Sequence, residues 1–327
     1  LYFDRMKSIA YYPADGTVYD SLTTINSKRG TYISDAKKYK FENNVVVTNP
    51  DFTLTSARMD FYTETKHAFF YGATTIIGED YVVRCREGFY NTDKKEGYFK
   101  KNASIDYNNR NIIGDSIYFN DTKKYASATQ NIRITDTINN SFITGNYGQV
   151  FKEKDSAMVT HRALAINLVE LDSLFIHADT LIATGPPERR IIRGFYGVRI
   201  FKEDLSGKTD SIYFNQTSGR AKLIRRPISD RDLQYLTPQE IADRNPILWS
   251  DESQMTGDEI HLTIDNEKEV LDSLLIYNNA FVIEQDSLDA VNFNQIKGLQ
   301  LKGKFKGKSL ETVDVIQYTE MVYYLYD

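Results

Sequence analysis

A short pattern of residues repeats along almost the whole chain, and it limits the folds that the chain can adopt. The clearest copy is Ile113-Gly114-Asp115-Ser116-Ile117-Tyr118-Phe119-Asn120. The positions that match Asp115 recur at nearly equal steps, of which only the last is much longer, and they are Ala57, Arg86, Asp115, Asn146, Asp179, Asp210 and Asp258. Residues two and four positions after each of these are mostly apolar, and such offsets fall on one face of a strand. The repeat therefore predicts a series of β-strands.

Each repeat has a second half about a dozen residues later, which begins with Asn or Gly and continues with alternating apolar residues. Its copies begin at Asn44, Gly72, Asn102, Asn131, Gly197 and Asn279. Polar turns such as residues 120–124 and 215–219 lie between the halves. Each repeat is therefore expected to form two short strands. A period of about 30 residues predicts stacked repeats that bury their apolar faces against one another.

The paired pattern Asp-x-Ile-x-Phe and Asn-Ile-x-Ile-x-Asp, in a chain rich in Tyr and Asn, resembles the OstA/LptA family over residues 17–318. Members of that family are periplasmic lipopolysaccharide transport proteins, and the periplasmic domain of the outer-membrane translocon LptD is one of them. The resemblance implies an all-β fold, an elongated open antiparallel β-jellyroll (β-taco) built from repeated two-strand units. Its apolar interior is expected to hold acyl chains.

The repeat also divides the chain into segments. We expect an irregular N-terminal segment at 1–26, an OstA-like β-repeat body at 27–226, a loop and short-helix insertion at 227–250, a continuation of the same body at 251–320 and a C-terminal tail at 321–327. The insertion contains three of the seven prolines and the single Trp. Within it, Thr237-Pro238-Gln239-Glu240 predicts the start of a short helix, since Thr can cap the helix, Pro suits its first position and Glu its third.

Composition and charge exclude several classes of protein. The net charge of −5 and the pI near 5.6 argue against a nucleic-acid-binding protein, which needs a basic face. No run approaches the roughly 20 apolar residues of a membrane-spanning helix. The single cysteine, Cys85, excludes an intramolecular disulfide framework, and its apolar alternation partners predict a buried thiol. The chain begins at Leu1, so we expect a processed product that lacks its targeting segment, and the periplasmic location is implied by the resemblance alone.

The sequence contains no recognisable catalytic or metal-binding motif. The four histidines are far apart in the sequence, and none belongs to an HxH or HExxH motif or lies near a pair of cysteines. No metal site and no cofactor are therefore predicted. The recurrent Asp-Ser pairs have no Gly-x-Ser-x-Gly context, so no catalytic residue is predicted. A polysaccharide-active enzyme on a repetitive β-fold is an alternative because carboxylates are plentiful. The two-strand unit nevertheless suits an antiparallel arrangement better than a coil.

The function predicted from these features is non-catalytic binding and transport of lipopolysaccharide, or a related envelope glycolipid, across the periplasm. The residues expected to line the lipid groove are Met59, Phe61, Ile117, Phe119, Ile132, Ile134, Ile212, Phe214, Ile260, Leu262, Leu299, Leu301 and Phe305. The expected partners are the glycolipid, other OstA-like or Lpt envelope proteins and further copies of the chain joined head to tail. A structural scaffold that carries no lipid is the alternative.

Two strand edges are expected to be open for such joining. The early one is residues 44–47, and the late ones are residues 299–308 and 313–316. The late region carries a row of lysines, Lys302, Lys304, Lys306 and Lys308, which is expected to protect an exposed edge or to contact lipid phosphate.

Overall fold

The computed structural model describes residues 1–20, 22–168, 173–203, 205–250, 253–265, 270–286, 288, 291–306 and 309–324. These residues form 25 β-strands, two short α-helices and one 3-10 helix. The strand pairings found among them are antiparallel, so the predicted all-β fold is confirmed. The chain forms two compact units, Leu1–Ile138 with Thr144–Glu153 and Asn139–Ile143 with Lys154–Asp327.

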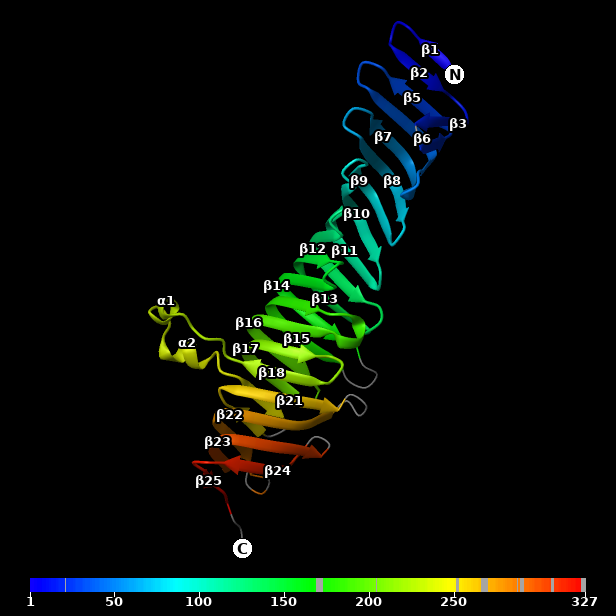
Figure 1. Ribbon diagram of the computed structural model, residues 1–327. Helices are drawn as coiled ribbons and strands as arrows, with labels where there is room; N and C mark the ends of the chain where they lie inside the picture. The colour runs from blue at the N-terminus through cyan, green and yellow to red at the C-terminus, as the bar shows by residue number, and fades with distance from the viewer. Residues whose placement is uncertain are drawn as a thin grey trace. The chain divides into compact units, whose positions relative to one another are not determined.

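The first unit contains β1 to β12 and the part of β13 from Thr144 onward; Figure 1 labels most of these strands. Their bounds are β1 Tyr2–Asp4, β2 Ile9–Tyr12, β3 Gly16–Asp20, β4 Thr23–Ser27, β5 Arg29–Ile33, β6 Lys38–Thr48, β7 Phe52–Tyr62, β8 His67–Gly78, β9 Tyr81–Asn91, β10 Glu96–Tyr107, β11 Arg110–Asn120, β12 Tyr125–Asp136 and β13 Ser141–Phe151.

The second unit contains the remaining strands and the helices. Their bounds are β14 Ser156–Asn167, β15 Leu174–Thr184, η1 Pro187–Arg189, β16 Ile191–Lys202, β17 Leu205–Asn215, β18 Arg220–Ile224, α1 Asp230–Leu233, α2 Pro238–Ala242, β19 Ile247–Ser250, β20 Ser253–Thr256, β21 Glu259–Asp265, β22 Val270–Gln285, β23 Phe293–Lys306, β24 Ser309–Ile316 and β25 Glu320–Val322.

The strands are longer than the sequence predicted, because each long strand bends at its middle. Strands β6 to β12 have 11 or 12 residues each. The register of their pairing shifts at the bend, for example between Lys100 and Ala103. We call this bend the corner. In β10 the corner residues Lys101 and Asn102 have φ of 59° and 61°, and in β12 Gln130 and Asn131 have 59° and 50°. Asn adopts this left-handed backbone more readily than most residues.

The Asn and Gly of the repeat therefore mark corners within strands, where we had expected strand starts. All six lie at corners: Asn44, Gly72, Asn102, Asn131, Gly197 and Asn279. At Gly72, φ is 90° and a Cβ would approach the Cβ of Ala57 to 2.8 Å, so glycine is required there. The corner of β14 is formed by His161 and Arg162, with φ of 62° and 64°. The repeat pattern missed this corner because it carries neither Asn nor Gly.

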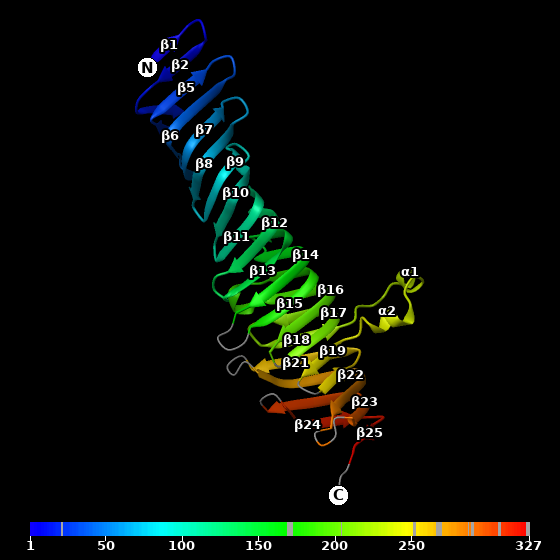
Figure 2. The same ribbon diagram turned by 180° about the vertical axis from the view of Figure 1, so that it is seen from behind.

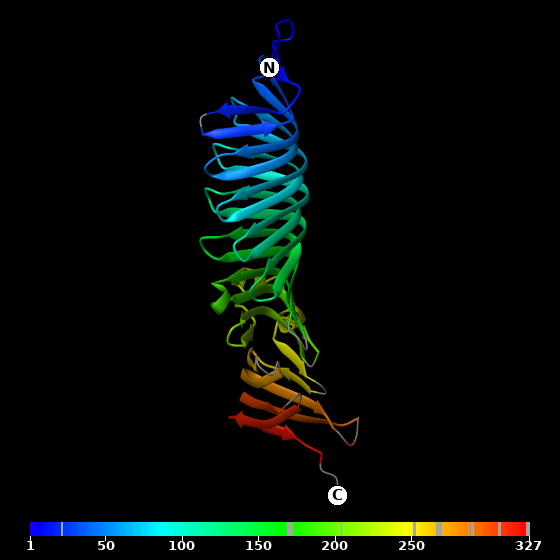
Figure 3. The same cartoon turned by 90° about the vertical axis from the view of Figure 1, so that its right-hand side faces the viewer.

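The corners divide the sheet of the first unit into two limbs that face each other, and Figure 3 shows these strands (blue to green) stacked one above another. Limb A comprises residues 45–48, 52–56, 74–78, 81–85, 103–107, 110–113 and 133–136, and limb B comprises residues 38–42, 58–62, 67–71, 87–91, 96–100, 116–120 and 125–129. The ring of Phe119 in limb B lies 4.7 Å from Tyr81 and 5.8 Å from Tyr107 of limb A. The apolar core of this unit thus lies between the limbs.

The opposite face of limb B carries a row of aromatic side chains. Its members lie on successive strands, with ring centroids 5.7 Å apart for Phe69 and Phe89, 5.6 Å for Phe89 and Tyr98, and 4.9 Å for Tyr98 and Tyr118. Cross-strand aromatic pairs of this kind stabilise a sheet. Tyr98 is 45% exposed, so it marks the outer surface.

The N-terminal segment 1–26 is not irregular, since it contains β1 to β3 and most of β4. Strands β5 and β4 pair with limbs B and A of β6, and β2 and β3 pair with β5 and β4 in turn. Each of these strands is too short to show a clear alternation in the sequence. Val46 pairs with Asn26 on one side and Thr55 on the other, so the predicted early open edge at residues 44–47 is wrong. Among the described strands, β3 pairs only with β4, and β1 only with β2.

The predicted helical insertion is present and leaves the sheet at a corner, but its predicted end at residue 250 is wrong, because Ile247–Ser250 form strand β19. Strands β18 and β19 pair with the two ends of β17, so together they make one bent strand whose corner holds the insertion. Helices α1 and α2 project away from the strands (Figure 2). Thr237 caps α2 with the predicted capping box. Because β19 and β18 also pair with β20 and β21, the stacking of strands continues past the insertion.

Both ends of the insertion are held by one carboxylate. Asp210 of β17 is buried, and its Oδ2 accepts hydrogen bonds from the backbone N and Nε of Arg226 (3.1 and 3.0 Å) and from a terminal nitrogen of Arg244 (3.1 Å). Arg226 lies just before the helices and Arg244 just after them. The position of Asp210 in the sheet therefore fixes where the insertion leaves and returns.

The lysine row lies on an interior strand, so its prediction as edge protection is wrong. Strand β23 pairs with β22 on one side and with β24 and β25 on the other. Lys302 lies opposite Asp314 of β24, and Lys306 forms an ion pair with Glu311 at 3.5 Å. Lys308 and the tail residues 325–327 lie outside the described residues.

Candidate functional site

A cavity of about 650 Å³ lies between limbs A and B at the N-terminal end of the first unit. Limb A contributes Phe52 and Leu54 to its wall. Limb B contributes Tyr39, Met59 and Phe61. The wall is completed by the β3–β4 hairpin, through residues such as Val18, Leu22 and Ile25. Apolar and polar groups contribute about equally to its surface, and a cavity of this volume is typical of sites for small ligands.

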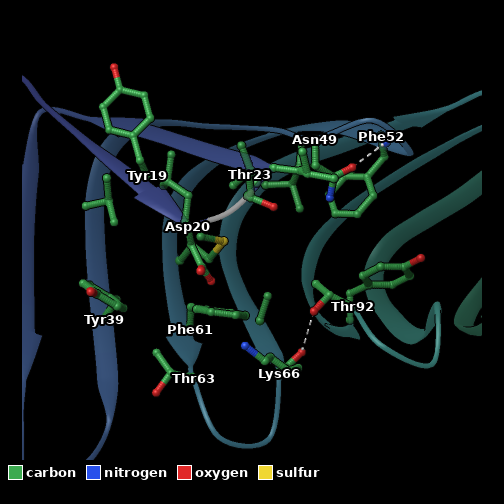
Figure 4. Close-up of a pocket in the computed structure, with 18 of the residues that line it drawn as sticks. Tyr19, Asp20, Thr23, Tyr39, Asn49, Phe52, Phe61, Thr63, Lys66 and Thr92 are labelled. Carbon is green, nitrogen blue, oxygen red and sulfur yellow. Dashed lines mark hydrogen bonds between the residues drawn. The ribbon is translucent and has the colours of Figure 1, made fainter.

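Polar groups lie at the margins of the cavity (Figure 4). On one side the Asn49 Oδ1 accepts hydrogen bonds of 2.9 Å from the backbone N–H groups of Asp51 and Phe52, which fixes the turn between β6 and β7. On the other side the backbone N–H of Thr92 donates to the carbonyl of Lys66 at 3.0 Å. Asp20 and Lys66 extend toward the cavity from opposite sides.

The strand turns form two rims along the first unit. One, which we call the acidic rim, consists of the turns at 20–23, 49–51 and 79–80 at the ends of limb A. The other, the lysine rim, consists of the turns at 34–37, 63–66, 92–95 and 121–124 at the ends of limb B. Backbone hydrogen bonds join successive turns of the lysine rim, such as Thr63 N to Lys37 O (2.9 Å) and Asp121 N to Lys95 O (2.9 Å).

Ion pairs cross from one rim to the other. Lys95 Nζ lies 2.9 Å from Asp51 Oδ2, and Lys124 Nζ lies 3.9 Å from Asp80 Oδ2. Lys152, after β13, also pairs with Asp80. Behind these pairs, burial raises the pKa of Tyr81 to about 12, with a smaller contribution from the charge of Asp121. These ion pairs therefore join the two rims over the part of the interior that follows the cavity along the first unit.

The cavity contains few of the predicted groove residues. Met59 and Phe61 line it. The others of the first unit, Ile117, Phe119, Ile132 and Ile134, are buried farther along the interior. In the second unit Ile212, Phe214, Ile260, Leu262 and Leu301 are buried, and Leu299 and Phe305 are half-buried. The structure thus places most of the set in the core, and their contact with lipid remains a prediction.

Several cavity residues escaped the sequence analysis. Val18, Leu22 and Ile25 come from the segment that was expected to be irregular. Asp20 and Lys66 were not selected because single charged residues in turns usually only face solvent. A signal was nevertheless present in the spacing: Asp20, Asp51 and Asp80 recur at nearly the period of the repeat, and Lys66, Lys95 and Lys124 recur at equal steps.

The described residues also bear on metal binding, thiol reactivity and membrane crossing. No group of three or more His, Cys, Asp or Glu residues that could hold a metal ion occurs among them. Burial raises the pKa of the Cys85 thiol to about 11. Neither of the helices within the described ranges is long and apolar enough to cross a membrane.

Comparison with known proteins gives one family match, which covers residues 1–57 and is described as "OstA-like protein". None of the curated proteins compared with the chain matches it. Among solved structures, a similar chain is LptH, the LptA homologous periplasmic component of the lipopolysaccharide transport device from Pseudomonas aeruginosa. It is 13% identical, with a TM-score of 0.29, and the alignment covers 32% of this chain and 75% of LptH. So low a TM-score carries no conclusion about this chain.

Proposed function

We propose that the chain, whose residues 1–57 match the OstA-like family, is a non-catalytic carrier of lipopolysaccharide or a related envelope glycolipid in the periplasm. The acyl chains would lie between limbs A and B. The observation that carries this proposal is the cavity of about 650 Å³ at the N-terminal end of that interior, whose wall includes Phe52, Leu54 and Phe61.

The energy available from apolar contact suits reversible binding. Each buried methylene contributes roughly 0.8 kcal/mol, so ten methylenes contribute about 8 kcal/mol. Association costs on the order of 4 kcal/mol or more. A single chain in the cavity would therefore be held weakly enough to be passed on, and several chains more tightly.

Movement of lipid beyond the cavity would require the limbs to separate. Ile117 and Phe119 are 0% exposed, so no water-sized space borders them. Their neighbours between the limbs are aromatic rings, including those of Tyr81 and Tyr107. An acyl chain at this depth would replace contacts between the limbs with contacts to the lipid, which costs little because both are apolar.

The experiment is photo-crosslinking of the full chain in a Gram-negative envelope. A photoreactive phenylalanine analogue at Phe61, inside the cavity, should crosslink to glycolipid. The same analogue at Tyr98, on the outer face, should not. Absence of lipid at Phe61, or equal crosslinking at the two positions, would overturn the proposal. A Phe61→Asp variant that remains folded should lose co-purified lipid, whereas Tyr98→Asp should keep it.

Association with other OstA-like proteins, or with further copies of this chain, belongs to the same proposal. Strands β1 and β3 each have one side that pairs with none of the described strands, and the free N–H and C=O groups there can extend a sheet. We expect light scattering to show association that grows with concentration. A strict monomer at every concentration, also in the presence of an OstA-like partner, would favour an independent carrier.

A further inference from the structure

The ion pairs between the two rims form a regular series, in which one expected pair, between Asp20 and Lys66, is not formed. Lys66, Lys95 and Lys124 occupy the same position in successive turns, with φ of 56°, 51° and 47°. Asp51 and Asp80 on the opposite rim pair with Lys95 and Lys124. The next carboxylate back along the acidic rim is Asp20, which the series matches with Lys66. Within the described part of the chain, Lys66 forms no ion pair with Asp20 or with any other residue.

The unformed pair lies at the mouth of the cavity. Asp20 and Lys66 both line it, and Figure 4 shows their side chains directed into it from opposite sides. Lys66 is partly buried, whereas Asp20 is exposed. Asp93, the other carboxylate of the lining, is also exposed, on the neighbouring turn. Among the described residues the Lys66 ammonium therefore has no carboxylate partner and can pair with an anion that enters the cavity.

We propose that Lys66 binds the anionic headgroup of an amphiphile, a phosphate or carboxylate, whose apolar chain occupies the cavity. The proposal rests on the function proposed above and identifies the residue that binds the headgroup. The ligand's anion would take the place that Asp51 and Asp80 take at Lys95 and Lys124. The chain would then extend along Phe61 and Phe52.

Asp20 is the competitor of the ligand for Lys66. With the cavity empty, a movement of Asp20 to Lys66 would complete the series and close the mouth. A bound anionic headgroup is repelled by Asp20 and keeps it away. Loss of the Asp20 charge should therefore favour the ligand, whereas loss of the Lys66 charge should disfavour it.

The test is calorimetric titration of the full chain with three probes: monodecyl phosphate, 1-decanol and inorganic phosphate, each below its aggregation concentration. The wild type should bind decyl phosphate at least tenfold more tightly than decanol, and inorganic phosphate should not bind measurably. Lys66→Gln should reduce this preference about tenfold, and Lys66→Arg should restore most of it. Asp20→Asn should increase affinity for decyl phosphate several-fold. Lys95→Gln is the matched control and should change neither affinity, because Lys95 already has a carboxylate partner.

The outcomes separate this inference from the function on which it rests. Equal binding of decyl phosphate and decanol by the wild type would overturn the headgroup site and leave the lipid carrier intact. The same holds if Lys95→Gln lowers affinity as much as Lys66→Gln does. Binding of inorganic phosphate alone would show an ion site without a lipid. If neither decyl compound binds, both this site and the cavity as a lipid site fail.

Discussion

The Nδ2 of Asn131 donates a hydrogen bond of 2.8 Å to the Oδ2 of Asp115, between the corners of two neighbouring strands. The same contact recurs in the second unit, where Asn279 Nδ2 lies 3.2 Å from both carboxylate oxygens of Asp258. At Asp210 the backbone N–H of Arg226 takes the place of the amide. Three of the aspartates that recur in the sequence, Asp115, Asp210 and Asp258, therefore hold the corner of the following strand.

Asn131 is expected to contribute to stability through its backbone as well as its side chain. Its φ of 50° costs about 1–2 kcal/mol for most residues. Asn131→Ala should therefore lower the urea midpoint of unfolding by the equivalent of roughly 2 kcal/mol, counting also the lost hydrogen bond. Asn131→Gly loses only the hydrogen bond and should be clearly less destabilised. Equal midpoints for the two variants would show that backbone strain at this corner is unimportant.

A second prediction concerns Asp210 and pH. Burial opposes its ionisation, but hydrogen bonds from Arg226 and Arg244 outweigh this and hold the pKa of Asp210 below its usual value. A carboxyl group with a lowered folded pKa stabilises the protein above its unfolded pKa, near 3.9, and loses that effect as the pH falls through the folded pKa. Asp210→Asn should thus cost roughly 1–3 kcal/mol at pH 7 and progressively less below pH 4.

Chemical denaturation at a series of pH values checks this expectation. The difference between wild type and Asp210→Asn should be constant from pH 7 to about pH 5 and then shrink. Asp258→Asn is the matched control, since Asp258 holds a neutral amide and no arginine. A difference that grows toward low pH would show that the carboxyl is not stabilised by its arginine partners.

The sequence predicted the repeat correctly because the alternation of buried side chains in a long strand is visible in one dimension. Ile117 and Phe119 were expected on one face, and both are fully buried. It did not predict the corners, because Asn131 in a left-handed conformation looks like a turn residue before a new strand. Short strands such as β3, which pairs with β4, were missed for a further reason. A strand of five residues is too short to show a clear alternation of apolar and polar side chains.

The cavity could not be predicted for a different reason. Its wall combines Phe61 with residues of a hairpin much earlier in the chain, such as Val18 and Leu22. The pairing of the rims also depends on the three-dimensional arrangement of the strands, in which Lys95 meets Asp51 and Lys124 meets Asp80. The equal spacing of the lysines identifies equivalent turns but does not tell which turn of one rim meets which turn of the other.

The ion pair between Asp51 and Lys95 should stabilise the protein because its two side chains carry opposite charges. Both side chains are more than a third exposed, so the pair contributes under about 1 kcal/mol and less in high salt. Lys95→Asp places two carboxylates together and should lower the melting temperature slightly at low salt. The double exchange Asp51→Lys with Lys95→Asp should recover it. A recovery that is the same in 1 M salt would mean that the effect is not electrostatic.

Cys85 provides a measure of how tightly the two limbs pack. It is 5% exposed in limb A, and burial raises the pKa of its thiol to about 11. The thiolate is the reactive form, so at pH 8 its population should be roughly 200-fold below that of a free thiol with a pKa of 8.5.

We therefore expect an aromatic disulfide reagent to modify Cys85 very slowly at pH 8 in the native protein and within seconds in 6 M urea. A Cys85→Ala, Tyr98→Cys variant, with its thiol on the outer face, should react at the free-thiol rate without denaturant. Raising the pH from 8 to 9 should accelerate native Cys85 about tenfold if thiolate formation limits the reaction. A rate that does not change with pH would mean instead that opening of the limbs is limiting, since every opening would then lead to modification. Fast reaction of native Cys85 at pH 8 would contradict the packed interior on which the closed part of the sheet depends.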